Sequence, residues 1–322
     1  MINLDDIRRS FSGRIAISEP LERYTTFRIG GPADIYLEPS DKHDAVALIA
    51  HLRRENVPFF LMGNGSNLLV ADEGIRGAVV NLEHGFNYVS ADDDGVITAG
   101  AGIRLAKFVD FCIGRGCRGA EMLAGIPGTL GGGIIMNAGA YGGEISDHLL
   151  AVEVIRGEEL VRVSKEMGGF AYRTSGLARD VVLEASFRFP EGSPEEMKTI
   201  RRETMLKRNR SQPVQFPNAG SIFKNPPGDH AARLIEACGL KGRRVGGAEI
   251  SELHANFIIN VDGASARDVL ALAAIARGEV ARRFGVELEL EIKPIGFDAD
   301  DLVALTKELP DASAQETRPQ AP

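Results

Sequence analysis

The chain has 322 residues, of which 44% are hydrophobic and 25% are charged, a composition typical of a globular protein with two or three domains. Its formal net charge of −8 argues against a general nucleic-acid-binding protein. No apolar run is long enough to span a membrane, and the first residues lack the apolar core of a signal peptide, so we expect a cytoplasmic protein.

The N-terminal part of the chain has the pattern of a small α/β unit. We expect a short helical arm over residues 4–11 and then a linker up to residue 22. The strands and the helix expected after this linker lie at residues 33–37 (strand), 44–55 (helix), 58–62 (strand) and 77–82 (strand).

A second unit begins with an expected strand at residues 96–99 and a helix at residues 105–112. The helix is indicated by apolar residues at spacings of three and four, namely Leu105, Phe108, Val109 and Cys112. Three apolar, β-branched segments then predict antiparallel strands at residues 149–155, 160–163 and 181–189. A helix closes the unit, because Ser193 is a good N-cap and Pro194 suits a first helical turn.

The C-terminal part is expected to mix helices and strands. A short helix at residues 231–237 and a strand at 255–260 precede a long helix, which Ser265 begins and which reaches residue 284. Apolar and glutamate residues alternate strictly at 286–292, which predicts a strand with one polar face. We therefore divide the chain into residues 1–90, 91–210, 211–298 and 299–322, the last being a helical extension and a disordered, Pro-rich tail.

Two glycine-rich stretches are the most unusual feature of the sequence. Residues 123–143 read LAGIPGTLGGGIIMNAGAYGG, and residues 63–68 read GNGSNL. Glycine lets the backbone approach a ligand closely, and successive N–H groups then form a concave nest for a phosphate. Together the stretches indicate one extended phosphorylated ligand, whereas either alone is also explained by a tight turn. A P-loop motif is missing, and no complete G-x-G-x-x-G follows an N-terminal strand, which argues against P-loop and Rossmann sites.

The three cysteines, Cys112, Cys117 and Cys238, show no C-x-x-C spacing. An odd number of cysteines without such spacing favours buried or free thiols in a reducing compartment over a disulfide framework. We expect no metal site.

Six short motifs follow one another in the order found in a known enzyme family. They are TTFRIGGPAD at residues 25–34, GNGSNLL at 63–69, GIPGTLGGGIIMNAGAYGGE at 125–144, YRTS at 172–175, NAGSIFKNP at 218–226 and ELEIKPIG at 289–296. Each motif alone is weak or moderate, but their combination and order over residues 20–296 are specific. The chain resembles the UDP-N-acetylenolpyruvoylglucosamine reductases (MurB), flavoenzymes of bacterial peptidoglycan precursor synthesis.

The resemblance implies an α/β FAD-binding fold of the vanillyl-alcohol-oxidase (PCMH) type in two subdomains, with a C-terminal α+β substrate domain. It also implies FAD bound without a covalent bond, and none of the six histidines lies in either glycine-rich stretch. The residues that we expect to bind FAD are Gly63, Asn64, Gly65, Ser66, Asn67, Leu68, Gly125, Ile126, Pro127, Gly128, Thr129, Gly131, Asn137, Gly139 and Ala140.

The implied reaction is reduction of the enolpyruvyl group of UDP-N-acetylglucosamine enolpyruvate to UDP-N-acetylmuramate, with NADPH as the reductant of FAD. Hydride delivery to the β-carbon leaves an enolate, which needs positive charge, hydrogen-bond donors and then a proton. Carried over by motif, Arg173 and Glu291 would stabilise this enolate, and Ser221 would supply the proton. The residues that we expect to bind the substrate are Tyr141, Tyr172, Arg208, Lys224 and Asn225.

Two forms of the family are known, one of which has a tyrosine-bearing loop that closes over the substrate. Between Arg173 and Ser221 this chain has room for one strand and one capped helix, so it resembles the form without the loop. We expect small-molecule ligands only, and no nucleic-acid, membrane or obligate protein partner.

Each catalytic assignment has a structural alternative. Arg173 and Ser221 also suit surface turns, and Glu291 is one of three glutamates on the polar face of residues 286–292. To act as described, Glu291 needs a proton and hence a pKa raised by burial. For the whole chain, the alternatives are another FAD-linked oxidoreductase of the same fold and a flavin- or sugar-nucleotide-binding protein without turnover.

Overall fold

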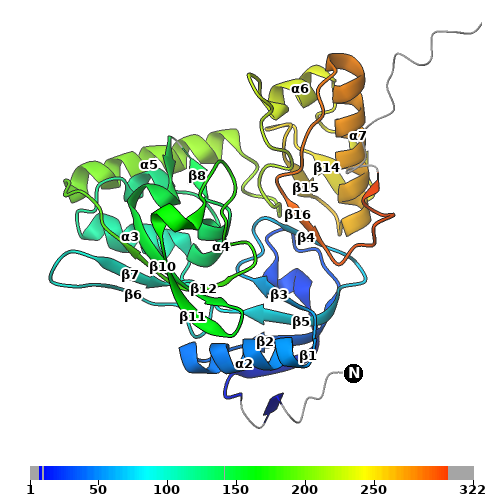
Figure 1. Cartoon of the computed structure of the whole chain (residues 1–322). Helices are drawn as coiled ribbons and strands as arrows, with labels where there is room; N and C mark the ends of the chain where they lie inside the picture. The colour runs from blue at the N-terminus through cyan, green and yellow to red at the C-terminus, as the bar shows by residue number, and fades with distance from the viewer. Residues whose placement is uncertain (1–6, 9–10, 141, 304–322) are drawn as a thin grey trace, which may run out of the picture.

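The computed structural model describes residues 7–8, 11–140 and 142–303. Figure 1 shows two sheets side by side, with the C-terminal part of the chain forming a further lobe above the first sheet. Of the helical arm expected at residues 4–11, the structure describes Ile7 and Arg8, which are helical, and Phe11, which is not. The tail expected to be disordered lies almost wholly outside the described residues.

The first sheet has the strand order β1-β2-β5-β3, in which β2 and β3 run parallel to β5 and β1 is antiparallel to β2. The Asp41 side chain accepts a hydrogen bond from the backbone N–H of Asp44 and so caps α2, which buries Leu48, Ile49 and Leu52. The prediction of a linker up to residue 22 is wrong, because most of that segment forms strand β1. The elements are β1 (Arg14–Pro20), β2 (Pro32–Glu38), α2 (Lys42–Arg54), β3 (Phe59–Met62) and β5 (Ile75–Asn81).

The second sheet has the order β11-β10-β12-β7-β6 and is antiparallel throughout, as the sequence predicts for its three longest strands. The helices of this unit lie on one side of the sheet in Figure 1. The sheet strands are β6 (Val89–Ala91), β7 (Ile97–Gly100), β10 (Leu149–Arg156), β11 (Glu159–Ser164) and β12 (Val181–Phe187). The helices are α3 (Leu105–Gly114), α4 (Leu130–Ile135) and α5 (Pro194–Ser211), with the small pair β8 (Gly139–Ala140) and β9 (Gly143–Glu144) nearby.

The longer glycine-rich stretch is more than a set of turns, because its middle forms α4. Leu130 and Ile134 on this short helix are fully buried, and Gly131 lies so close to Ala101 that an added Cβ would stand 2.9 Å from the Ala101 Cβ. Glycine therefore allows α4 to pack directly on the chain that leaves β7.

The C-terminal lobe holds two helices and short strands. The predicted helices at 231–237 and 265–284 are confirmed, and the second carries a capping box formed by Ser265 and Asp268. The prediction of a regular strand over residues 286–292 is wrong. Within this segment only Leu290 forms a β-bridge, to Phe223, and the pairing of β16 with β4 starts at Lys293. The elements are α6 (Ala231–Ala237), β13 (Arg244–Val245), β14 (Ala248–Ile250), β15 (Ile258–Asn260) and α7 (Ala266–Phe284), with β16 (Lys293–Ile295) pairing β4 (Leu68–Val70).

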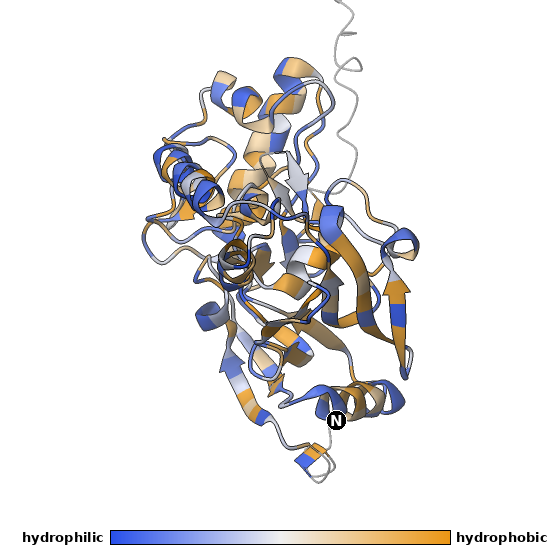
Figure 2. Ribbon diagram, turned by 90° about the vertical axis from the view of Figure 1, so that its left-hand side faces the viewer, coloured by the Kyte–Doolittle hydropathy of each residue, from blue (hydrophilic) through white to orange (hydrophobic). Residues whose placement is uncertain are grey.

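One hydrophobic core runs through both sheets and their helices, and a second core fills the C-terminal lobe. The second core also takes in Phe27, Ile29 and Leu69 from the N-terminal part of the chain. Hydrophobic residues accordingly line one side of the helices in Figure 2, while hydrophilic residues cover the other. The division of the chain at residues 90, 210 and 298 stays a prediction.

The C-terminal lobe is fastened to the first unit by backbone and side-chain bonds. Strand β16 pairs parallel with β4. Strand β4 begins at the end of residues 63–68, which we call the first glycine-rich stretch, residues 123–143 being the second. The Asp72 carboxylate accepts hydrogen bonds from the backbone N–H groups of Ala266 (2.8 Å) and Arg267 (3.4 Å) at the start of α7. Asn260 Nδ2 donates to the carbonyl of Phe27 at 3.1 Å. This strand pairing and these hydrogen bonds place the first glycine-rich stretch beside the C-terminal lobe.

Candidate active site

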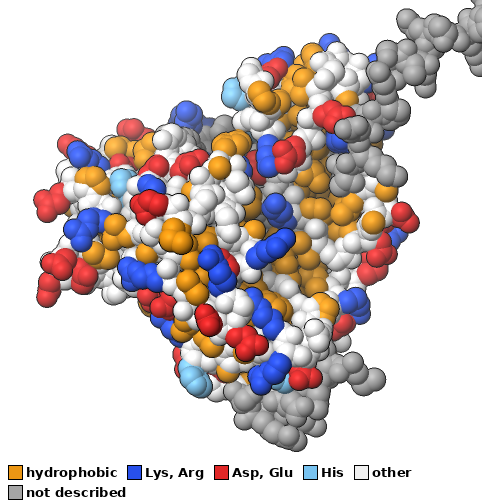
Figure 3. Space-filling model, in the orientation of Figure 1, with side chains coloured by type: hydrophobic (Ala, Val, Ile, Leu, Met, Phe, Trp, Pro, Cys, Tyr) orange, Lys and Arg blue, Asp and Glu red, His pale blue; other side chains and the backbone are white. Residues whose placement is uncertain are grey.

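A cavity of about 830 Å³ lies where the two sheets and the C-terminal lobe meet. Its volume is in the upper part of the range for small-molecule and cofactor sites. Lys and Arg side chains gather near the centre of the face shown in Figure 3. The lining includes all but one of the residues predicted to bind FAD, namely Gly63, Asn64, Gly65, Ser66, Asn67, Leu68, Gly125, Ile126, Pro127, Gly128, Thr129, Gly131, Gly139 and Ala140.

The two glycine-rich stretches meet in this wall, and glycine is required where they touch. A Cβ added at Gly63 would stand 2.3 Å from Thr129 Oγ1, and one at Gly128 (φ +117°) would stand 2.8 Å from Ser66 Oγ. Within the described part of the chain, the backbone N–H groups of residues 63–67 have no hydrogen-bond acceptor. Successive N–H groups that are left unbonded beside a cavity form a nest suited to a diphosphate.

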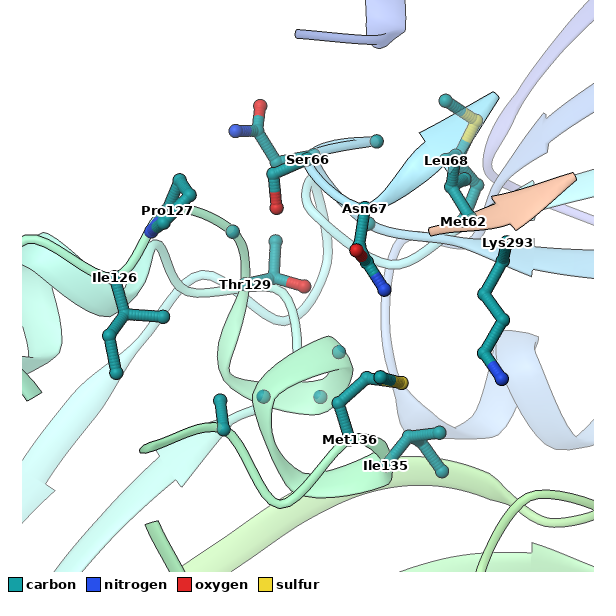
Figure 4. A pocket seen from close by; sticks show the side chains of 18 of the residues that line it. Met62, Ser66, Asn67, Leu68, Ile126, Pro127, Thr129, Ile135, Met136 and Lys293 are labelled. Atoms are coloured by element: carbon teal, nitrogen blue, oxygen red, sulfur yellow. The ribbon is translucent and has the colours of Figure 1, made fainter. Parts of the chain in front are cut away.

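The rest of the cavity suits a flat ring with a polar edge. Asn67 and Lys293 point into the same space, opposite Ile135 and Met136 at the end of α4 (Figure 4). One side of this space is therefore apolar and the other carries an amide and an ammonium group. The cradle, the volume and this mixed lining fit FAD, whose pyrophosphate needs the nest and whose ring needs close backbone approach.

Arg173 reaches the cavity from a tight turn in the segment between β11 and β12. Ala171 and Thr174 exchange backbone hydrogen bonds at 3.1 Å, and Arg173 between them has φ +57°, the left-handed region that costs a non-glycine residue energy. Asn137 Nδ2 donates to the carbonyl of Ala171 at 3.1 Å, and Ser175 Oγ donates to that of Ile135 at 2.9 Å. The turn is thus fixed to the longer glycine-rich stretch.

Glu291 lines the cavity and pairs with this arginine. Arg173 Nε donates to Glu291 Oε1 at 2.9 Å, and the two side chains are 22% and 19% exposed. Burial raises the pKa of Glu291 above its ordinary value, while the charges of Arg173 and Lys224 act in the opposite direction. The other two glutamates of this segment, Glu287 and Glu289, are exposed. The structure therefore separates Glu291 from its neighbours, as its expected chemistry requires.

Ser221 lines the same cavity from the C-terminal lobe. It follows Gly220, which has φ +77° and whose N–H donates to Asn218 Oδ1 at 2.9 Å. The next residue, Ile222, accepts a hydrogen bond at 2.8 Å from the backbone N–H of Glu291. Segments far apart in the sequence thus bring Arg173, Ser221 and Glu291 to one cavity.

Comparison with known proteins shows the family and the domains of the chain. A family model described as UDP-N-acetylenolpyruvoylglucosamine reductase, C-terminal domain, matches residues 212–295, and an FAD binding domain model matches residues 33–164. A UDP-N-acetylenolpyruvoylglucosamine reductase of Chloroherpeton thalassium is 44% identical over 92% of this chain and 98% of its own. One of Heliobacterium modesticaldum is 43% identical over 91% and 94%.

The chain belongs to the UDP-N-acetylenolpyruvoylglucosamine reductase family. The crystal structure of the family member from Thermus caldophilus (MurB) has a TM-score of 0.74 and 37% identity, covering 88% of this chain and 98% of that one. The predicted family, the α/β FAD-binding fold and the C-terminal domain are thereby confirmed.

Several residues that we expect to bind substrate or cofactor in this reductase do not line the cavity. Asn137 is fully buried behind the wall, where it also donates to Glu144 Oε2 at 2.7 Å. Tyr172 is 53% exposed, with the Arg173 guanidinium 5.0 Å from its ring centroid. Their assigned roles stay predictions.

The same holds for two residues of the NAGSIFKNP motif. Lys224 forms an ion pair with Glu289, and Asn225 Oδ1 accepts a hydrogen bond at 3.1 Å from the N–H of Ala231, the first residue of α6. Arg208 does line the cavity, where its Nε donates to Gln212 Oε1 at 2.9 Å. Tyr141 lies outside the described residues.

Lys293, Gln212 and Phe257 line the cavity and were not predicted to do so. A signal for Lys293 existed, because it lies two residues after Glu291 and alternation places both on one face. No sequence signal marked Gln212 or Phe257, because their approach to the cavity depends on how the C-terminal lobe packs.

The structure also bears on the cysteines and on membrane-spanning helices. Cys112 and Cys117 are buried, Cys238 is half-buried, and all three are free. Within the residues that the structure describes, none of the helices combines the length and the apolar character that a membrane crossing requires.

Proposed function

We propose that this chain reduces the enolpyruvyl group of UDP-N-acetylglucosamine enolpyruvate with NADPH and forms UDP-N-acetylmuramate for peptidoglycan synthesis. We further propose that it acts in the cytoplasm, on small molecules, without an obligate protein partner. The observation that carries the proposal is the Arg173–Glu291 pair beside Ser221, in a cavity lined by both glycine-rich stretches. Family membership supports the choice of substrate.

The glycine-rich stretches are the residues that would hold FAD. The N–H groups of residues 63–67 would donate to its diphosphate, and Ile135 and Met136 would contact the apolar part of its ring. When bound, FAD supplies hydride transfer from NADPH to the enolpyruvyl β-carbon.

The side chains at the other side of the cavity handle the charge that the substrate develops. As hydride adds to the β-carbon, the π electrons of the double bond move to the α-carbon and its carboxylate. The Arg173 guanidinium stabilises this negative charge, and the Glu291 carboxyl, whose pKa burial raises, donates a hydrogen bond to it in its protonated form. Ser221 Oγ–H then gives its proton to the α-carbon and is reprotonated from solvent.

The basic and aromatic residues around the cavity are proposed to bind the sugar nucleotide. Arg208 faces the cavity and is suited to the UDP diphosphate. Lys224, Asn225, Tyr172 and Tyr141 are proposed to contact the substrate once it is bound.

Anaerobic spectroscopy of the purified chain tests the proposal. We expect a yellow protein that NADPH bleaches and that UDP-N-acetylglucosamine enolpyruvate recolours, whereas simple alcohols do not. Recolouring by alcohols would instead support another FAD-linked oxidoreductase. A chain that binds flavin but never turns over would support the non-catalytic alternative.

A further inference from the structure

Asn67 makes two hydrogen bonds to the chain immediately after Glu291, although Asn67 and Glu291 are 224 positions apart. Its side-chain Nδ2 donates to the backbone carbonyl of Glu291 at 3.0 Å. Its own backbone carbonyl accepts a hydrogen bond at 2.9 Å from the N–H of Lys293. Asn67 also lines the cavity, at the end of the first glycine-rich stretch. One residue of the cofactor loop therefore brackets Ile292, the residue that follows the acid.

This bracket lies where regular structure gives little support. The residues before Glu291 form an isolated bridge at Leu290, and the β4–β16 ladder begins only at Lys293. On its other side, the backbone N–H of Glu291 donates to Ile222 at 2.8 Å. Between that bond and the ladder, the N–H of Ile292 makes a longer bond of 3.4 Å to the same Ile222 carbonyl, and Asn67 donates to the carbonyl of Glu291.

The side chain of Glu291 is held from a different direction. Arg173, on the turn that Asn137 fixes to the second glycine-rich stretch, draws the carboxylate toward the second sheet. Asn67 anchors the backbone to the first unit at the same time. The carboxyl is therefore fixed between two anchors, each tied to one of the stretches that line the cofactor cavity.

We propose that Asn67 is a positioning residue for Glu291, so that the loop that cradles the cofactor also sets the place of the catalytic acid. The inference rests on the proposed function and adds a role to a residue expected only to bind FAD. Catalytic groups displaced by about 1 Å lose on the order of 100-fold in rate. Loss of the Asn67 amide is therefore expected to act on kcat through Glu291.

The test compares Asn67→Ala in two backgrounds, the native chain and Glu291→Gln. Steady-state kcat and KM are measured with NADPH and the enolpyruvyl sugar nucleotide at saturating FAD, and the FAD dissociation constant is measured by flavin fluorescence. In the native background we expect kcat to fall about tenfold or more, with both KM values within about threefold. In the Glu291→Gln background the additional loss is expected to be under about threefold, because residues that act through one another are not additive.

Asn260→Ala is the matched control. Asn260 makes the same kind of bond across the same boundary, from Nδ2 to the carbonyl of Phe27, but away from the cavity. We expect its kcat to stay within about twofold of native. If Asn67→Ala fails to fold, Asn67→Asp provides the same comparison, because it keeps the shape and removes the N–H donor.

The outcomes separate the two proposals. A native chain that is inactive on the sugar nucleotide would overturn the proposed function. An active native chain in which Asn67→Ala costs the same factor in both backgrounds would overturn the positioning role alone. An Asn67→Ala variant with weaker FAD binding but native kcat at saturating FAD would overturn it too.

Discussion

Arg173 and Glu291 lie 118 residues apart, and Arg173 Nε donates to Glu291 Oε1 at 2.9 Å. Each residue is tied to a different glycine-rich stretch. Asn137, in residues 123–143, bonds the turn that carries Arg173, and Asn67, in residues 63–68, bonds the carbonyl of Glu291. Both residues line the cavity, and their ion pair links the segment before β12 to the C-terminal lobe. Its integrity therefore reports on the assembly of the whole site.

Removing the guanidinium should abolish most of the catalysis. Arg173→Ala is expected to lower kcat by about 100-fold or more, because loss of one group that stabilises developing negative charge has a cost of that order. Arg173→Lys should recover only part of the loss, since an ammonium group lacks the planar fork. Arg76→Ala, at an exposed ion pair with Asp34, is the control and should retain native kcat. Native turnover in Arg173→Ala would contradict the assignment.

Glu291 should make stability depend on pH in a defined direction. Burial raises its folded-state pKa above the ordinary 4.5, so the folded chain keeps this proton to higher pH than the unfolded chain does. The resulting stability is fully present below about 4.5 and is lost as pH rises through the raised pKa. Glu291→Gln cannot titrate, so native stability relative to this variant should fall as pH rises through that window. Urea unfolding at a series of pH values measures the difference, and a difference that rises with pH would refute the raised pKa.

The first glycine-rich stretch should tolerate no side chain where it meets the second. An added Cβ at Gly63 would stand 2.3 Å from Thr129 Oγ1, so Gly63→Ala must displace one loop and is expected to weaken FAD binding about tenfold or more. Gly278→Ala is the control, because nothing lies within 4 Å of its added Cβ and Gly278 sits inside helix α7. That variant should keep native FAD affinity and gain up to about 1 kcal/mol of stability. Flavin fluorescence titration measures both affinities, and equal values would count against the cradle.

The C-terminal lobe should depend on Asp72 for its attachment. Its carboxylate accepts from two N–H groups at the start of α7, so Asp72→Ala is expected to cost about 1 kcal/mol. Its neighbour Glu73 forms only an exposed ion pair with Arg267, and Glu73→Ala should cost less than about 0.5 kcal/mol. Thermal unfolding of both variants compares the two, and equal costs would show that the helix cap contributes nothing.

Local pattern predicted the elements whose stability is local. The α7 helix carries its own capping box and ends at Gly285, and the strands β10 to β12 pair along strongly β-branched segments. The prediction of a strand over residues 286–292 failed for a physical reason. Its alternation correctly indicates that Leu288 and Ile292 are buried and Glu287 exposed, but a strand also needs a partner, and here only Leu290 has one.

The candidate site was predictable in residue type and motif, but not in assembly. The glycine-rich stretches, Arg173, Ser221 and Glu291 all line one cavity, as the family motifs suggested. The hydrogen bonds by which Asn67 and Asn137 hold the segments of Glu291 and Arg173 could not be predicted. They join residues that are 224 and 34 positions apart, and such bonds leave no local sequence pattern. Lys224 carries a motif signal yet pairs with Glu289, since side-chain direction is set by packing.

The account depends most on Ser221 acting as the proton donor, and the half-reactions of Ser221→Ala test this directly. Under anaerobic conditions we expect the variant to be bleached by NADPH at the native rate, because Ser221 has no part in that step. Its reoxidation by UDP-N-acetylglucosamine enolpyruvate should be slower by about 100-fold or more, in line with the contribution of a positioned acid. Reoxidation at the native rate, or equal slowing of both half-reactions, would contradict the mechanism.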